Sequence, residues 1–490
     1  MSNSIWNEEI IAYERKGTLE SHKVEVAVIG GGLTGILTAY LLQQQGKQVE
    51  VFEADTIGGG MTGNTTAKIT SQHRLIYDRL ITQYGMEKAK EYARRNEQAI
   101  AQYETLIQEK GIDCEFTRES AYVYTTKDTK NIKAEVEAAK KVGIDAYFTT
   151  ETALPFPVTG AVCFPNQARF HPIKFLAAIA KELTIWEHAM VRRIKGNTLE
   201  VLDQTREGNL VEIEADKIVI ATHYPMLNHP GYFFLRMYQE RSYVVAVKQE
   251  KGLAHGMYIG EQEDDLSFRR SGEYILIGGE NHRVGISGSK EHKKSLQYVA
   301  ARLYPDAPIV ASWSNQDCMS LDQIPYIGRL SKRRNDRYVA TGFSKWGMST
   351  SMVAANMLTE YITGAMPIED SIFSPSRFSY KASKKNGKDH IKTTIKGFFG
   401  FTGQPMAEKL YQIKKGDAGI VWHKGRRIGV YRDEEGKVHA VAARCTHLGC
   451  RLSWNKEEKT WDCPCHGSRF DYDGNLLTNP TKKALCRKEY

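Results

Sequence analysis

Two short boxes of cysteine and histidine near the C-terminal end are the residues best suited to redox or metal chemistry. Residues 445–450 read CTHLGC and residues 463–468 read CPCHGS. The ligand order is C-x-H, then fifteen intervening residues, then C-x-x-H, which supplies two thiolates and two imidazoles. A [2Fe–2S] cluster with two cysteines on one iron and two histidines on the other needs this set. The boxes therefore predict a centre that carries one electron at a time.

Zinc is the alternative occupant, because two cysteines and two histidines also form a tetrahedral zinc set. Zinc fingers usually pair like ligands closely, as C-x2-C and H-x3-5-H. Here each box mixes one cysteine with one histidine, and each carries an additional cysteine. We therefore favour the iron–sulfur cluster over zinc.

The boxes resemble those of the Rieske proteins of cytochrome bc-type complexes, and the resemblance covers roughly residues 406–490. It implies a disulfide between Cys450 and Cys465 that ties the two cluster loops together. It also implies four ligands, two for each iron: Cys445 and Cys463, His447 and His466.

The same resemblance places further residues around the cluster. Ser468 is expected to donate a hydrogen bond to it, which raises its potential. High-potential members of the family have Tyr two residues after this Ser, whereas this chain has Phe470. The absence of that hydroxyl donor predicts a lower reduction potential, because hydrogen bonds to the cluster sulfurs tune the potential. Residues 479–481 (NPT) stand where the family has a loop that shields the cluster.

A second signal lies near the N-terminal end. Residues 24–29 form an apolar, β-branched run that predicts a buried strand. Residues 30–35 (GGGLTG) follow directly and fit G-x-G-x-x-G, and a helix-like pattern occupies 36–45. Residues 48–52 read as the next strand and end at Glu53. This order of strand, glycine turn, helix, strand and acid is typical of a dinucleotide-binding fold.

Each residue of this motif has a physical task. Gly30 allows the tight turn, Gly32 lets the backbone approach a pyrophosphate, and Gly35 lets helix and strand pack closely. The helix N-terminus offers oriented N–H donors to phosphate oxygens. Glu53 can accept hydrogen bonds from both ribose hydroxyls. The motif therefore predicts a nucleotide site.

Residues 1–380 resemble the FAD proteins of the glycine oxidase, sarcosine oxidase and D-amino acid oxidase/dehydrogenase family. Four further segments carry this resemblance: 58–66 (GGGMTGNTT), 217–222 (KIVIAT), 322–328 (DQIPYIG) and 338–348 (YVATGFSKWGM). The last one precedes a helical pattern whose N-terminus, in the family, points at the flavin and stabilises its anionic reduced form. The resemblance thus implies FAD contacts besides the first turn and Glu53, from Thr62, Ala221, Thr222, Gly342, Gly347 and Met348.

Catalytic residues are less well defined by the sequence. The family often holds a substrate carboxylate with an arginine, and Arg269 is a candidate, with Lys345 of the flavin-facing turn as a second. For Arg269, as for its neighbour Arg270, an ordinary surface role is the favoured alternative, and for Lys345 a solvent-facing role is an equal alternative. His73, His171 and His223 lie in flavin-adjacent segments and read as structural. Hydride transfer from a neutral amine needs no catalytic base, and no His or Cys tether for covalent FAD is evident.

The expected fold class is α/β: an FAD-binding Rossmann-like domain with an interleaved, mainly antiparallel substrate domain, followed by a small all-β Rieske domain. A length of 490 residues suits two to four domains. The expected boundaries are 1–380 for the oxidoreductase (FAD-binding part about 20–230 and 311–370, substrate part mainly 231–310), 381–405 for a basic linker, and 406–490 for the Rieske domain.

Charge and cysteine content bear on the partners and the location of the protein. The net charge is +9, and residues 381–415 carry nine lysines with little apolar periodicity. We favour a solvated linker over a membrane-touching arm and expect no nucleic-acid partner. We recognise no targeting segment and no membrane span. Eight cysteines do not form a disulfide framework, so we expect a cytoplasmic protein.

The sequence therefore predicts an FAD-dependent dehydrogenase of an amine or amino acid. A hydride passes to FAD, and the cluster delivers the electrons singly to an external acceptor. An onboard one-electron outlet favours a dehydrogenase over an oxidase with a vestigial cluster. Two alternatives stay open: a reductase or monooxygenase fed inward by an external donor, and a non-enzymatic redox sensor. The substrate, the acceptor and the oligomeric state are not specified.

Overall fold

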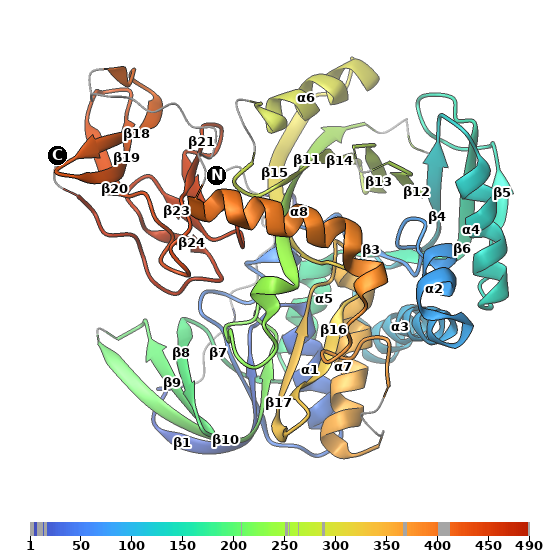
Figure 1. The fold of residues 1–490 in the computed structure, drawn as a ribbon. Coiled ribbons are helices and arrows are strands. Elements are labelled where there is room, and N and C mark those ends of the chain that lie inside the picture. The colour runs from blue at the N-terminus through green and yellow to red at the C-terminus, as the bar shows by residue number, and fades with distance from the viewer. Residues whose placement is uncertain are drawn as a thin grey trace.

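The computed structural model describes residues 4–6, 13, 17–206, 208–249, 253, 255–262, 264–286, 290–365, 370–399 and 412–488. Two large sheets make up most of the chain, and two small sheets form a separate C-terminal domain at one side of them (Figure 1). The mixed α/β class and the small all-β domain are those that the sequence predicts.

The first large sheet is built on the predicted nucleotide motif. Strand β1 pairs in parallel with β2 and with β10, and β17 extends the parallel core beyond β10. Continuous apolar strands suit such a sheet, because helices cover parallel strands on their faces. Its eight strands are β1 (His22–Ile29), β2 (Val49–Phe52), β7 (Thr184–Trp186), β8 (Ala189–Lys195), β9 (Thr198–Asp203), β10 (Asn209–Ile220), β16 (Tyr326–Ser331) and β17 (Arg334–Thr341).

The second large sheet is mainly antiparallel, with one parallel pair between β12 and β4. Its nine strands are β3 (Lys68–Ile69), β4 (Thr117–Thr125), β5 (Tyr147–Thr149), β6 (Gly160–Arg169), β11 (Met237–Lys248), β12 (Met257–Gly260), β13 (Ser267–Ser271), β14 (Tyr274–Arg283) and β15 (Ile309–Ser320). Residues 68–169 and 311–320 fall within the expected FAD-binding part, but strands β3 to β6 and β15 join this second sheet. The interleaving is therefore deeper than the pattern 231–310 alone indicates.

Helices link and cover the two sheets. Helices α1 and α7 pack together beside the first sheet, and Thr34 Oγ1 of α1 lies 2.8 Å from Ser351 Oγ of α7. Helix α6 packs on β11, β14 and β15. The α-helices of the part that contains the two large sheets are α1 (Leu33–Gln44), α2 (Tyr77–Tyr84), α3 (Met86–Lys110), α4 (Lys130–Lys141), α5 (Pro172–Ala180), α6 (His292–Leu303) and α7 (Gly347–Thr363).

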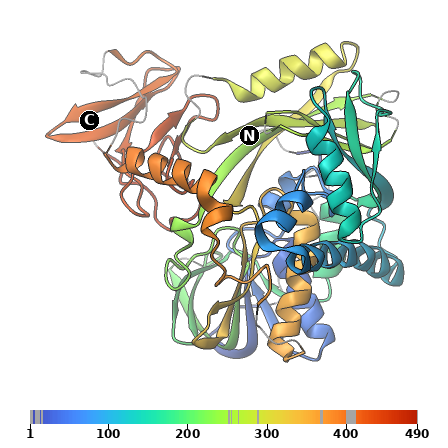
Figure 2. The ribbon, with the colours of Figure 1, turned by 45° about the vertical axis from the view of Figure 1, so that its right-hand side comes forward.

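The expected basic linker takes a regular form over most of its length. Residues 380–399 form helix α8 (Tyr380–Phe399), which runs between the two large sheets and the C-terminal domain in both views (Figures 1 and 2). Residues 400–405 of the expected linker lie outside the described residues. Lysine has good helix propensity, so a polar sequence can still be helical where one face is packed.

The C-terminal domain consists of two small antiparallel sheets around an aromatic core. The first cysteine–histidine box lies in the loop between β20 and β21, and the second between β22 and β23. The strands are β18 (Asp417–His423), β19 (Arg426–Arg432), β20 (Val438–Ala442), β21 (Ser453–Asn455), β22 (Thr460–Asp462), β23 (Arg469–Asp471) and β24 (Leu476–Thr478).

Among the described residues, none of the helices combines the length and the apolar character needed to span a bilayer.

Candidate functional site

The glycine turn after β1 is packed so closely that side chains do not fit. A Cβ on Gly35 would lie 1.9 Å from the carbonyl oxygen of Gly30. A Cβ on Gly30, whose φ is +112°, would lie 2.5 Å from the carbonyl oxygen of Ala221 at the end of β10. This packing brings the backbone of the turn, the N-terminus of α1 and β10 together, as a bound dinucleotide requires.

Glu53 and Thr62 accept hydrogen bonds from backbone N–H groups of this turn and of the start of α1. The Glu53 carboxylate accepts the Gly31 N–H at 2.6 Å, and burial raises the pKa of this carboxyl. Thr62, in the short helix η2 (Met61–Asn64), accepts the Leu33 N–H at 3.1 Å. Helix α1 starts after Gly32 without a side-chain cap from that residue. The arrangement fits the phosphate and ribose of FAD.

The turn between β17 and α7 forms the second edge of the site. Gly342, Ser344 and Lys345 all have positive φ, at 71°, 50° and 75°, which bends the chain sharply before α7. Helix α7 starts at Gly347, and the Tyr103 hydroxyl donates to the Met348 carbonyl at 2.8 Å. The positive end of the helix therefore lies at the turn that the family resemblance assigns to the flavin.

The three flavin-adjacent histidines have mainly structural contacts. His73 stacks on Trp346 with ring centroids 4.7 Å apart, and burial lowers its pKa to about 3. His171 precedes Pro172 and accepts the Lys174 N–H at 3.3 Å, which caps α5. His223 is different, because its Nε2 is buried without a hydrogen-bond partner in the described part of the chain.

Arg269 does not present a free guanidinium. Its side chain is 1% exposed and donates to the carbonyls of Thr66 and Ala67, at 2.5 and 2.7 Å, and to Ser271 Oγ. It also lies over the ring of Trp6. These contacts favour a role in holding the small-residue loop rather than a substrate carboxylate.

Lys345 is also engaged. Its Nζ lies 2.8 Å from Asn281 Oδ1, 3.3 Å from a Glu240 carboxylate oxygen and 3.9 Å from Asp317. Burial raises the pKa of Asp317 to about 6. Lys345 thus links the flavin-facing turn to β11, β14 and β15.

The cysteines of the two boxes lie together. Cys450 and Cys465 form a disulfide. Sγ atoms of Cys450, Cys463 and Cys465 lie within 4.8 Å of one another, but the disulfide leaves only Cys463 of these as a thiolate donor. The Cys463 side chain hydrogen-bonds to Cys445 and lowers the pKa of that thiol to about 7. Two thiols thus face each other beside a disulfide.

The two histidines of the boxes complete the donor set. Their ring centroids are 5.0 Å apart, and both Nδ1 atoms are buried without a hydrogen-bond partner in the residues that the structure describes. Nε2 of His447 bonds to Asn228 Oδ1, and Nε2 of His466 to the Phe234 carbonyl, each at 3.0 Å. Burial lowers the pKa of His447 to about 4 and of His466 to about 3, so both rings are neutral, as metal ligands must be. Two thiols and two orphaned Nδ1 atoms fit a [2Fe–2S] cluster.

Gln316 of β15 joins the two halves of the site. Its backbone N–H donates to Met61 Sδ at 3.4 Å, in the loop assigned to the flavin. Its side chain donates to the Gly467 carbonyl of the second box at 2.8 Å and to Gln239. Gln239 in turn donates to the His466 carbonyl at 2.7 Å. A single residue thus contacts both regions.

The expected shielding loop also reaches the FAD half. Asn479 Nδ2 donates to the Thr222 carbonyl at 2.9 Å and to the Tyr224 carbonyl at 3.3 Å. Thr222 directly follows β10 in the segment assigned to FAD. The loop therefore faces the nucleotide-binding half of the chain.

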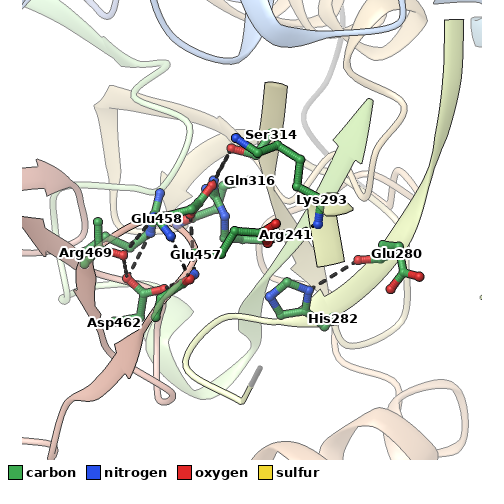
Figure 3. Close-up of polar contacts among 12 residues, drawn as sticks. Arg241, Glu280, His282, Lys293, Ser314, Gln316, Glu457, Glu458, Asp462 and Arg469 are labelled. Carbon is green, nitrogen blue, oxygen red and sulfur yellow. Dashed lines mark hydrogen bonds and ion pairs between the residues drawn. The ribbon is translucent and has the colours of Figure 1, made fainter. Parts of the chain in front are cut away.

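A buried ion cluster fixes the remainder of this interface (Figure 3). Glu458 of the C-terminal domain pairs with Arg241 of β11 and with Arg469, and accepts from Ser314 at 2.7 Å. Arg469 also donates to Asp462 at 3.0 Å. Nearby Arg241 and Arg469 hold the pKa of Glu458 down to about 2 against its burial. The carboxylate is therefore charged and shared by both halves.

Sequence reasoning did not identify the residues of this interface. Asn228, Phe234, Gln316 and Glu458 belong to no recognisable motif. Each contacts a residue of the other part of the chain that is 144 to 232 positions away in sequence. No local pattern in a single sequence signals such contacts.

Comparison with known proteins agrees with this division of the chain. A family model described as FAD dependent oxidoreductase (DAO) matches residues 25–361, and one described as Rieske [2Fe-2S] domain matches residues 405–488. The chain is 36% identical over 483 residues to YhfW of Bacillus subtilis, whose name describes a Rieske 2Fe-2S iron-sulfur protein; the match covers 95% of this chain and 93% of YhfW.

Solved structures show the same fold for the first part. Glycine oxidase from Geobacillus kaustophilus is similar with a TM-score of 0.61 and 20% identity, over 73% of this chain and 100% of that chain. L-proline dehydrogenase from P. horikoshii is similar with a TM-score of 0.60 and 20% identity, over 74% of this chain and 98% of that chain.

Proposed function

Because the chain belongs to the DAO family of FAD-dependent oxidoreductases and carries a C-terminal Rieske [2Fe–2S] domain, we propose that it dehydrogenates an amine or amino acid. Its cofactors are FAD and the Rieske cluster. The electrons leave FAD through the cluster to an external one-electron acceptor. Bound FAD would take up the hydride, and the cluster would carry the electrons away singly.

Most of the proposed FAD residues follow the carboxyl ends of the parallel strands β1, β2, β10 and β17, which lie at one end of the first sheet. Gly30, Gly32 and Gly35 admit the pyrophosphate, and Glu53 and Thr62 line the same turn. The other proposed contacts come from the segment after β10 and from the turn between β17 and α7 with the first residues of α7: Ala221, Thr222, Gly342, Gly347 and Met348.

The proposed cluster ligands are the two free thiols and the two orphaned Nδ1 atoms. Cys445 and Cys463 hold one iron, and His447 and His466 hold the other. The disulfide Cys450–Cys465 ties the two loops together.

The observation that carries the proposal is the bridge made by Gln316. It contacts Met61 in the flavin loop and Gly467 in the second cluster box. A cluster held there is adjacent to the flavin region, so that its natural electron partner is the FAD of the same chain.

The choice of substrate class is supported by the fold relatives. They are named glycine oxidase, L-proline dehydrogenase and L-amino acid deaminase, which are all names for proteins that act on amino acids. A C–N bond of an amine or amino acid is therefore the proposed site of oxidation.

The test is an anaerobic panel of amino acids and secondary amines added to the oxidised holoenzyme. We expect one substrate class to bleach the flavin absorbance and then to generate the paramagnetic resonance signal of the reduced Rieske cluster. Bleaching without that signal would contradict the proposed route, and a cluster potential far below that of FAD would reverse its direction.

A further inference from the structure

Helix α8 is fixed to both parts of the protein by one of its faces. His390 bonds through Nε2 to the Phe234 carbonyl at 3.0 Å and through Nδ1 to Arg283 at 2.7 Å. Near the end of the helix, a Cβ on Gly397 would lie 2.6 Å from Cys465 Sγ, and the Gly397 carbonyl accepts the Arg451 N–H at 2.9 Å. The helix therefore lies directly against the cluster disulfide.

The other face of α8 is exposed, basic and partly apolar. Ile391 and Ile395 are 61% and 54% exposed. Together with three lysines they line a shallow pocket of about 500 Å³: Lys388, Lys392 and Lys396. The whole helix carries six lysines and one aspartate. We call the five pocket residues the α8 patch.

We propose that the α8 patch docks an acidic protein that carries one electron, and that the electron crosses to the cluster beside Gly397 and Cys465. One electron moves between the carrier and the cluster, one being oxidised and the other reduced, with no bond made or broken. The inference rests on the proposed role of the cluster and adds its outside partner.

Three observations support a protein partner at this place. First, small apolar centres ringed by charge suit the weak, electrostatically steered encounters of electron-transfer proteins. Second, the Nε2 atoms of the two proposed histidine ligands are hydrogen-bonded to Asn228 and to the Phe234 carbonyl. The histidine side of the cluster boxes is therefore in contact with the first part of the same chain. Third, the helix that carries the α8 patch contacts the disulfide side of the boxes through Gly397, on its packed face.

A membrane surface is the competing occupant of a basic amphipathic helix. Here the opposite face of α8 is already packed, and among the side chains of α8 that the structure describes the large, exposed apolar ones are two isoleucines. That area is small for burial among lipid chains, whereas the charge suffices to attract an acidic protein.

The test uses the oxidised holoenzyme and a reduced, acidic plant-type [2Fe–2S] ferredoxin as the probe. Stopped-flow absorbance follows reduction of the Rieske cluster at low ionic strength. The variant K388E/K392E/K396E should lower the second-order rate constant about tenfold or more, because steering contributes 10- to 1000-fold. The wild-type rate should also fall steeply with added salt, and that of the variant should not.

A matched variant controls for net charge. K127E/K130E/K141E reverses three exposed lysines on and near α4, at the opposite edge of the molecule from the C-terminal domain (Figure 1). It should retain the wild-type rate within about twofold, since a distant charge is screened. Equal losses in both triple variants, or no loss in the α8 variant, would overturn the proposal.

The membrane alternative has its own measurement. Sedimentation with vesicles of phosphatidylglycerol and phosphatidylcholine should leave the holoenzyme in the supernatant at physiological salt. Two results together would favour a lipid surface over the protein partner. The wild type would bind the vesicles and the α8 variant would not, and both would be reduced by ferredoxin at the same rate. No amine is needed in either assay, so failure of the proposed substrate class would not affect the result.

Discussion

In each histidine of the cluster boxes, the two ring nitrogens have different surroundings. Nδ1 of each is buried without a partner in the described chain, whereas Nε2 of each meets an oxygen acceptor of the FAD half. A neutral imidazole that ligates metal through Nδ1 carries its proton on Nε2. The acceptors, Asn228 Oδ1 and the Phe234 carbonyl, match that tautomer.

The first prediction concerns the ligand set. Replacing Cys445→Ser removes one proposed thiolate, so the protein should lose its labile sulfide and its Rieske resonance signal while FAD stays bound. Cys486→Ser is the control, since Cys486 is an exposed free cysteine outside both boxes. Retention of a full cluster in the first variant would contradict the assignment.

A second prediction concerns Asn228. Replacing Asn228→Asp places a negative charge at the acceptor of His447 Nε2, which favours the oxidised, more positive cluster. We expect the reduction potential, measured by resonance-monitored titration, to fall relative to the wild type. The control Asn197→Asp changes charge equally at a site near Arg334, on the first sheet. If both variants shift the potential alike, the contact with His447 has no special effect.

At the scale of elements, the nucleotide motif was the most predictable part. Its strand, turn and helix follow from local periodicity and from glycines, and the structure has β1, α1 and β2 at these positions. Helix α8 was not predicted, because its sequence is polar and its packed face is made mainly of small or polar residues such as Gly387, His390 and Gly397. Its order depends on tertiary contacts that no local pattern reveals.

The second sheet was predicted only in part, for a similar reason. Strands β11 and β14 show strong local signals, but β3 to β6 lie more than 60 residues earlier and pair with this sheet over long range. Strand pairing partners are not encoded in a strand's own alternation. Asn228 and Gln316 were not predicted for the same reason, because their partners lie far away in the sequence.

The third prediction belongs to the glycine turn. Replacing Gly35→Ala puts a Cβ 1.9 Å from the Gly30 carbonyl, so the turn must open. We expect loss of bound FAD on purification and a destabilisation of about 1–3 kcal/mol or more, as for overpacking. The measurements are the flavin-to-protein absorbance ratio and urea unfolding.

Gly387→Ala provides the control for added volume. Its Cβ would meet Leu321 Cδ1 at an ordinary 3.9 Å. In a helix interior this exchange should stabilise the protein by up to about 1 kcal/mol and leave FAD content unchanged. FAD loss in this variant instead would show that α8 and not the turn limits flavin retention.

At the scale of the whole molecule, the two halves are held by charge as well as by hydrogen bonds. Glu458 is shared between Arg241 of β11 and Arg469 of the C-terminal domain. Replacing Glu458→Ala leaves these two buried arginines without this partner, and breaking a buried pair costs about 3–5 kcal/mol. We expect the C-terminal domain to become sensitive to limited proteolysis and the urea midpoint to fall.

The control is the exposed pair of Lys456 and Asp417, which lies on the same domain. Lys456→Ala should cost about 0–1 kcal/mol, as surface pairs do. Equal effects of the two substitutions would contradict a dominant role for Glu458 at the interface.

The same carboxylate makes a prediction about pH. The folded pKa of Glu458 is lowered to about 2, so its contribution to stability is complete above its ordinary pKa near 4.5. It should be lost progressively as the pH falls from about 4.5 toward 2. Urea midpoints measured across this range should fall more steeply for the wild type than for Glu458→Ala.

The bridge through Gln316 and the course of α8 have a consequence for reaction order. Donor and acceptor belong to one polypeptide, so their encounter needs no diffusion, and flavin-to-cluster transfer should be first order and insensitive to dilution of the enzyme. Severing the peptide between the oxidoreductase and the Rieske domain, and diluting until the two parts separate, would turn the same event into a bimolecular one, whose speed depends on the concentration of the freed fragment.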